Sequence, residues 1–197
     1  MPDLREYRAL LERADAWYRG CQAARPDRVP CRRGCRDCCL GLFDVSLLDR
    51  DLLQEGMVAL ERPEREDVRA RAGAILGTLR ADFPDLGEDL DGWSPEEIDD
   101  LCDAAGPVEC PVLGTEGECR LYGHRPLICR LEGIPLVDAT GEAVHPEGCP
   151  RCSLGADEAP RFDVRALRRE ERRILRRRFG GRGGVTLLIP QALAGTG

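Results

Sequence analysis

Four cysteines lie within nine residues between Cys31 and Cys39, in the run Cys-Arg-Arg-Gly-Cys-Arg-Asp-Cys-Cys. Ordinary core packing does not require thiols at this density, whereas thiolates are preferred ligands of zinc, copper(I) and iron–sulfur clusters. Gly34, inside the run, supplies the backbone freedom that a chelating turn needs. The run therefore indicates a metal site.

A second group of five cysteines lies far downstream, and with the first it makes nine thiols. A structural zinc ion or a four-iron cluster commonly takes four, so the supply exceeds one site. Adjacent side chains of an extended segment face opposite ways, so Cys38 and Cys39 favour two metals over one. The metal is expected to be zinc or iron, with an iron–sulfur cluster as one form. The candidate ligands are Cys31, Cys35, Cys38, Cys39, Cys110, Cys119, Cys129, Cys149 and Cys152.

We expect the two groups to form one composite site, in which the first four cysteines share metal with Cys110, Cys119 and Cys129. Neither segment has enough apolar residues to hold its own loop together. Closing a long connection costs only about 0.6 kcal/mol per doubling of its length, whereas thiolate ligation contributes on the order of 10 kcal/mol. Metal binding can therefore close the loop and fix the helices around it. Cys149 and Cys152 are candidates because their two-residue spacing is typical of chelating pairs.

The remaining two of the eleven cysteines, Cys21 and Cys102, are interpreted as buried core residues. No apolar run is long enough to cross a membrane, and the charged start of the chain does not resemble a secretory signal. We therefore expect a cytoplasmic protein, in which thiols stay reduced and available to metals. Disulfides fit poorly because the count is odd and because a bond between Cys38 and Cys39 would strain the peptide.

All 29 basic residues are arginine, and the net charge is −7. The acidic total and the absence of lysine argue against nucleic-acid binding, although nine arginines lie between Arg165 and Arg182. Other arginines adjoin the thiols, where a cation lowers thiol pKa. These are Arg32, Arg33, Arg36, Arg120, Arg125, Arg130 and Arg151. His124 and His145 are second-choice metal ligands because thiols are in excess.

Periodicity predicts a mainly α fold of one domain over residues 1–197, with helices packed around a cysteine-rich metal-binding loop core and a minor β-hairpin. Capping signals mark three helix starts, at Asp3, Ser94 and Asp163. The expected elements are helices over 3–20, 47–58, 68–84, from 94 and from 163, a hairpin over 134–144 and a short strand over 185–189.

The first run, followed by Cys110-Pro-Val-Leu and by Cys119-Arg-Leu-Tyr-Gly-His-Arg-Pro-Leu-Ile-Cys129-Arg130, resembles the YkgJ-type cysteine-cluster family. That family carries a zinc- or iron-chelating CxxCxxCC domain. The resemblance extends from about Cys31 to Cys149 and implies that seven cysteines bind metal. They are Cys31, Cys35, Cys38, Cys39, Cys110, Cys119 and Cys129, and Tyr122, Arg125, Pro126 and Arg130 match a non-ligand signature. The chain departs from the family by having three residues, not two, between Cys31 and Cys35.

Two enzymatic alternatives stand beside metal binding. The family domain is similar to part of a flagellin lysine N-methylase, which implies methyl-transfer or redox chemistry. The spacing of Cys31, Cys35 and Cys38 is also similar to the cluster signature of radical S-adenosylmethionine enzymes, but these need a partial βα barrel after the motif. Here the predicted order is helix, helix, acidic loop and helix. Metal binding is favoured because every motif found concerns ligation.

Overall fold

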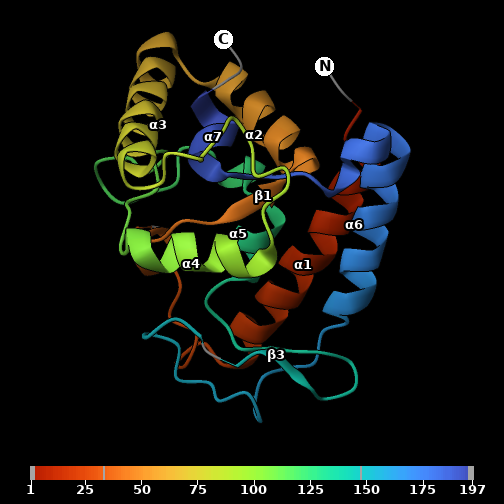
Figure 1. Ribbon diagram of the computed structural model, residues 1–197. Coiled ribbons are helices and arrows are strands. Elements are labelled where there is room, and N and C mark those ends of the chain that lie inside the picture. The colour runs from red at the N-terminus through yellow and green to blue at the C-terminus, as the bar shows by residue number, and fades with distance from the viewer. Residues whose placement is uncertain (1–2, 33, 147, 195–197) are drawn as a thin grey trace. The chain divides into compact units, whose positions relative to one another are not determined.

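A computed structural model describes residues 3–32, 34–146 and 148–194, so the predicted thiol neighbour Arg33 lies outside the described residues. The structure is 54% helical, which confirms the mainly α prediction. Seven α-helices occur within the described ranges (Figure 1). They are α1 (Arg5–Ala24), α2 (Leu47–Ala59), α3 (Arg62–Asp82), α4 (Pro95–Ala105), α5 (Leu127–Leu131), α6 (Val164–Phe179) and α7 (Ile189–Ala194).

Short elements complete the described chain. The strands form two antiparallel pairs, β1 with β4 and β2 with β3. The strands are β1 (Asp44–Ser46), β2 (Leu136–Val137), β3 (Ala143–His145) and β4 (Thr186–Leu188), and the 3-10 turns are η1 (Asp37–Cys39), η2 (Tyr122–His124) and η3 (Gly180–Gly184). The β2–β3 pair confirms the predicted hairpin, which turns through Gly141 at a φ of 95°. β4 confirms the predicted strand, whereas β1 and α7 were missed.

The chain divides into two compact units, each built from separated segments. Within the described residues, unit 1 comprises 39–126 and 184–194, and unit 2 comprises 3–38 and 127–183. The boundary separates Cys38 from Cys39, so the first cysteine run contributes to both units. The single domain predicted over residues 1–197 stays a prediction.

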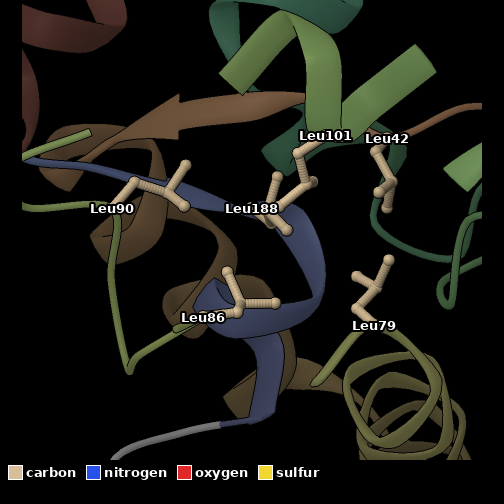
Figure 2. Close-up of a cluster of buried hydrophobic side chains, with 6 residues drawn as sticks. All are labelled: Leu42, Leu79, Leu86, Leu90, Leu101 and Leu188. Carbon is tan, nitrogen blue, oxygen red and sulfur yellow. The ribbon is translucent and has the colours of Figure 1, made fainter. Parts of the chain in front are cut away.

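Unit 1 has a leucine core. Figure 2 shows six buried leucines that come from α3, α4, β4 and the connecting loops, namely Leu42, Leu79, Leu86, Leu90, Leu101 and Leu188. Cys102 packs against this cluster, which confirms it as a core cysteine. α4 begins at the predicted capping box, where Ser94 accepts a hydrogen bond from the Glu97 N–H, and the Glu97 carboxylate accepts one from the Ser94 N–H. A second capping box, between Ser46 and Asp49, starts α2 and was not predicted.

In unit 2, α1 packs against α5 and α6. The predicted capping box of Asp3 and Glu6 is wrong, because Leu4 occupies the cap position without a side-chain hydrogen bond. The Asp3 carboxylate instead accepts hydrogen bonds from the backbone and guanidinium of Arg5. The helix continues to Ala24, four residues beyond its predicted end, and buries Cys21, which is 1% exposed.

The α6 helix begins where the sequence predicts, since the Asp163 carboxylate accepts a hydrogen bond from the Ala166 N–H. Its arginines partly serve the fold of unit 2. The guanidinium groups of Arg173 and Arg177 both pair with Glu6 of α1. In the described ranges, no helix has the length and apolar character of a membrane span.

Replacing Leu101 with Ala should lower the free energy of unfolding by about 2–5 kcal/mol, because the side chain is 1% exposed and its loss leaves a cavity in the leucine core. Denaturant titration followed by circular dichroism measures the change. The control, Val58→Ala on α2, removes an apolar side chain that is 68% exposed and should change stability by less than about 0.5 kcal/mol. Equal losses in the two variants would contradict this assignment of the core.

Candidate metal centre

In unit 2, three other thiols lie close enough to Cys31 to influence its charge. Burial raises the pKa of the Cys31 thiol, and the negative charges of Cys35, Cys38 and Cys149 raise it further. Cys31, Cys35 and Cys38 belong to the cysteine run, whereas Cys149 comes from the distant second group. Unit 2 therefore brings together part of each predicted cysteine group.

Local backbone bonds shape the cysteine run. The Cys35 N–H donates to the Arg32 carbonyl over 2.9 Å, and Gly34 within this turn has a φ of 84°. Such a φ favours glycine, because a Cβ atom would strain the left-handed backbone. The 3-10 turn η1 then carries Cys38 and Cys39. The bond between Arg32 and Cys35 and the turn η1 are thus the local structure of the run within the described residues.

Cys31 is attached to α1 by two hydrogen bonds. The Tyr18 hydroxyl donates to the Cys31 Sγ over 2.8 Å, and the Gln22 Nε2 donates to the Cys31 carbonyl over 2.5 Å. The donors are four residues apart, so they lie on one face of the helix. The same thiol packs against a small apolar cluster made by Cys21, Val29, Ile134 and Leu154. Helix α1 thus positions the first cysteine of the run.

Cys149 and Cys152 form a turn, in which the Cys152 N–H donates to the Cys149 carbonyl over 2.7 Å. The Cys149 N–H donates to the Gly133 carbonyl, which anchors the turn beyond α5. Arg151, between the two cysteines, pairs through its Nε with Asp37 of η1 at 2.5 Å. The charges of Cys35 and Cys149 further stabilise its guanidinium. A cation therefore stands beside Cys35 and Cys149, two of the four thiols.

A further ion pair holds the segment after Cys152. Arg28 binds the Glu158 carboxylate and lowers the pKa of Glu158 to about 2. The Arg28 guanidinium also donates to the Ser153 carbonyl, and the Ser153 N–H donates to the Arg28 carbonyl. These contacts join the chain before Cys31 to the chain after Cys152 within unit 2.

Unit 1 holds a second set of three thiols. The Cys110 N–H donates to the Cys39 carbonyl over 2.9 Å, and Cys119 pairs with Leu113 in a β-bridge. Burial raises the pKa of the Cys110 thiol to about 11, and the charge of Cys119 raises it to a smaller extent. Arg71 donates to the Cys110 carbonyl and partly offsets this rise. Cys39 is thus joined to Cys110 by a backbone hydrogen bond, and Cys119 lies close enough for its charge to act on the Cys110 thiol.

The structure does not present an assembled coordination sphere. Among the residues it describes, no three His, Cys, Asp or Glu side chains form a group that could hold a metal ion. The donor chemistry nevertheless fits zinc or iron, since all four neighbouring groups in unit 2 are thiols. Ligation requires these thiols to close around the ion. The predicted composite site takes thiols from both units and stays a prediction.

The other candidate ligands have different surroundings. Cys129 lies on α5, and Cys152 packs against the apolar cluster that contains Cys21. The His124 ring packs against Gly56, where an added Cβ atom would lie 2.8 Å from the His124 Cγ. His145 lines a cavity beside α6. The two histidines therefore have structural surroundings of their own, and thiols stay the preferred ligands.

Several arginines expected to stand beside thiols instead form structural contacts. Arg130, 7% exposed, pairs with Asp15 of α1, while Arg120 pairs with Asp67 of α3. The Arg125 guanidinium lies 3.7 Å from the centroid of the Tyr122 ring. The non-ligand signature therefore includes a buried ion pair in unit 2 and a cation–π contact in unit 1.

Sequence reasoning missed the polar residues that support the thiols, namely Tyr18, Gln22 and Asp37. The four-residue spacing of Tyr18 and Gln22 was a signal, because it places both on one helix face. It was not specific, since polar residues at this spacing are also typical of a solvated face.

Comparison with protein families agrees with this chemistry. Residues 30–150, more than half of the chain, match the family model CxxCxxCC, described as a putative zinc- or iron-chelating domain. No curated protein and no solved structure matches the chain.

Replacing Tyr18 with Phe should slow iodoacetamide alkylation of Cys31 about two- to tenfold in the reduced, metal-free protein. The Tyr18 hydroxyl lowers the pKa of Cys31, so its loss raises that pKa and reduces the thiolate fraction near neutral pH. Peptide mapping by mass spectrometry measures the rate at each cysteine. The control Tyr122→Phe alters a tyrosine of unit 1 and should leave the Cys31 rate unchanged. A rate at Cys31 that is unchanged or faster in Tyr18→Phe would contradict the proposed role of the hydroxyl.

Proposed function

Because the chain belongs to the CxxCxxCC family, whose description supports metal binding, we propose that it chelates zinc or iron through cysteine thiolates. The observation that carries this proposal is that Cys31 lies within the electrostatic influence of Cys35, Cys38 and Cys149 in unit 2, although these thiols do not yet form a closed coordination group among the described residues. Four thiolates close together repel one another, and a bound cation removes that repulsion. Four sulfur ligands also match the tetrahedral coordination of structural zinc.

A second metal is supported by the thiols of unit 1. Cys39, Cys110 and Cys119 belong to this unit, whereas Cys38, the neighbour of Cys39, belongs to unit 2. The expectation that Cys38 and Cys39 serve different metals assumed an extended segment, whereas both lie in the 3-10 turn η1. The second metal is therefore proposed from the number of thiols and from the division of these two cysteines between the units. Cys129 and Cys152 complete the proposed ligand set.

The bound metal would cross-link loops that have little apolar surface of their own. The chain's own residues prepare the thiols for this role. Tyr18 orients Cys31 and stabilises its thiolate, and Arg151 offsets negative charge near Cys35 and Cys149. Loops that carry the thiols then form the metal-binding core around which the helices pack. A reducing compartment such as the cytoplasm would keep these thiols available.

The purified protein should contain more than one thiolate-bound zinc or iron ion per chain, because the thiols exceed the four that one such ion takes. Elemental analysis of anaerobically purified protein measures the stoichiometry, and its absorption spectrum separates colourless zinc from an iron–sulfur cluster. A fully folded, metal-free protein under reducing conditions would refute the proposed function.

The variants Cys35→Ser and Cys149→Ser should each lose metal from unit 2. The double variant should lose no more metal than either single variant. This non-additivity is expected because both thiols belong to one proposed set. Metal content is compared with that of Cys102→Ala, which removes a core thiol outside the set and should keep full occupancy. Loss of metal in Cys102→Ala, or additive losses from Cys35 and Cys149, would contradict the assignment.

A second pair of variants tests whether Cys129 binds the same metal as Cys38. If Cys38 and Cys129 share a metal, Cys38→Ser and Cys129→Ser should each destabilise the fold, and their effects should be strongly non-additive. Metal analysis and thermal unfolding of the two single variants and the double variant complete the cycle. Independent metal losses with additive effects on stability would exclude a shared site and favour separate thiol knuckles.

A further inference from the structure

Unit 2 contains a cavity that is separate from the proposed thiol ligands. Its volume is about 510 Å³, within the range of about 300–1,000 Å³ that is typical of small-molecule sites. It is walled by α5, the β2–β3 hairpin and α6. Its described lining contains no cysteine, so the metal proposal does not account for it.

Part of the cavity lining is apolar. Leu131, Leu136 and Val164 are buried there, and Val144 on β3 is 44% exposed, which is unusual for a large apolar residue in this protein. Ile128 of α5 completes this surface. An aliphatic group placed here would cover apolar area of Val144 and of the half-buried Ile128 that is otherwise exposed to water, which is favourable.

The lining also contains four arginines of α6. Arg165, Arg168, Arg169 and Arg172 follow one another at steps of three, one and three residues, so they lie along one helix face. Two of them are already paired. Arg165 binds Asp138 and Glu142, and Arg168 binds Glu171.

Arg169 and Arg172 differ from these two. Both are exposed, and neither makes an ion pair or side-chain hydrogen bond within the part of the chain that is described. Two guanidinium groups three residues apart, at the edge of an apolar cavity, can bind one oxyanion with charge-assisted hydrogen bonds. The cavity thus offers an oxyanion site directly beside an apolar surface.

An acid in the described lining, Glu132, limits the charge of a ligand. Glu132 is half-buried, and burial raises the pKa of its carboxyl, while His145 opposes that rise. When ionised, this group repels a dianion more strongly than a monoanion. A carboxylate therefore suits the site better than a phosphate monoester.

We infer that this cavity binds an amphipathic carboxylate, with its head group on Arg169 and Arg172 and its aliphatic chain against Leu136 and Val144. This binding activity is additional to metal chelation and does not depend on it. The two functions occupy different side chains of unit 2.

Isothermal titration of the purified protein with octanoate tests the inference. Octanoate should bind at least about tenfold more tightly than 1-octanol, which lacks the charge, and than acetate, which lacks the chain. Comparable binding of acetate would indicate a carboxylate site without the apolar wall, for instance on a metal, and would overturn the inference. So would equal binding of 1-octanol, no binding of octanoate at millimolar concentration, or tighter binding of octyl phosphate.

Variants locate the site. Arg169→Gln and Arg172→Gln should each weaken octanoate binding by about ten- to a hundredfold, because each removes a charge-assisted hydrogen bond. Arg176→Gln is the matched control, since Arg176 is exposed on the same helix but does not line the cavity, and it should leave affinity unchanged. Val144→Asn should weaken octanoate binding and leave acetate binding unchanged. An effect of Arg176→Gln equal to that of Arg169→Gln would overturn the proposed location.

Discussion

The position of the cysteine run in unit 2 depends on the attachment of Cys31 to helix α1. The Tyr18 hydroxyl holds the thiol, and Gln22 holds the backbone of the same residue. The bonds matter because the cysteine run has few apolar side chains that could fix its position by packing. Burial raises the pKa of the Cys31 thiol, and the hydrogen bond from Tyr18 partly opposes this rise because it stabilises the thiolate. The loop is therefore supported before any metal closes it.

Charge is organised at two levels around this loop. Arg151 and Asp37 form an exposed pair beside the thiols, where a single ion pair contributes little to stability but supplies a cation close to sulfur. Arg130 and Asp15 form a buried pair in unit 2, where loss of one partner would leave an uncompensated charge. The arginines near the cysteines thus differ in role according to burial, although they are identical in type.

The arginines of the α6 helix also differ in role. Arginines that face α1 pair with Glu6, and Arg165 and Arg168 pair with acids of the hairpin and of α6 itself. These intramolecular pairs account for much of the positive charge that could otherwise suggest nucleic-acid binding. Arg169 and Arg172 are left beside an apolar cavity, which makes them the arginines of this helix with the clearest opportunity to bind a small anion.

The sequence determined the local features, because their causes lie within a few residues. Periodic apolar residues predicted α2, α3 and α6, and Ser94 predicted the start of α4 through its capping box. The cysteine run and the downstream signature indicated the metal-chelating family, because thiols at this density and spacing are typical of metal ligation and are not needed for packing.

Only the tertiary structure decided which distant residues meet. It brought Cys149 into the charge environment of Cys31, and it placed Tyr18, Gln22 and Arg151 beside the thiols. Such choices depend on contacts between segments far apart in the chain, and neither periodicity nor spacing encodes them.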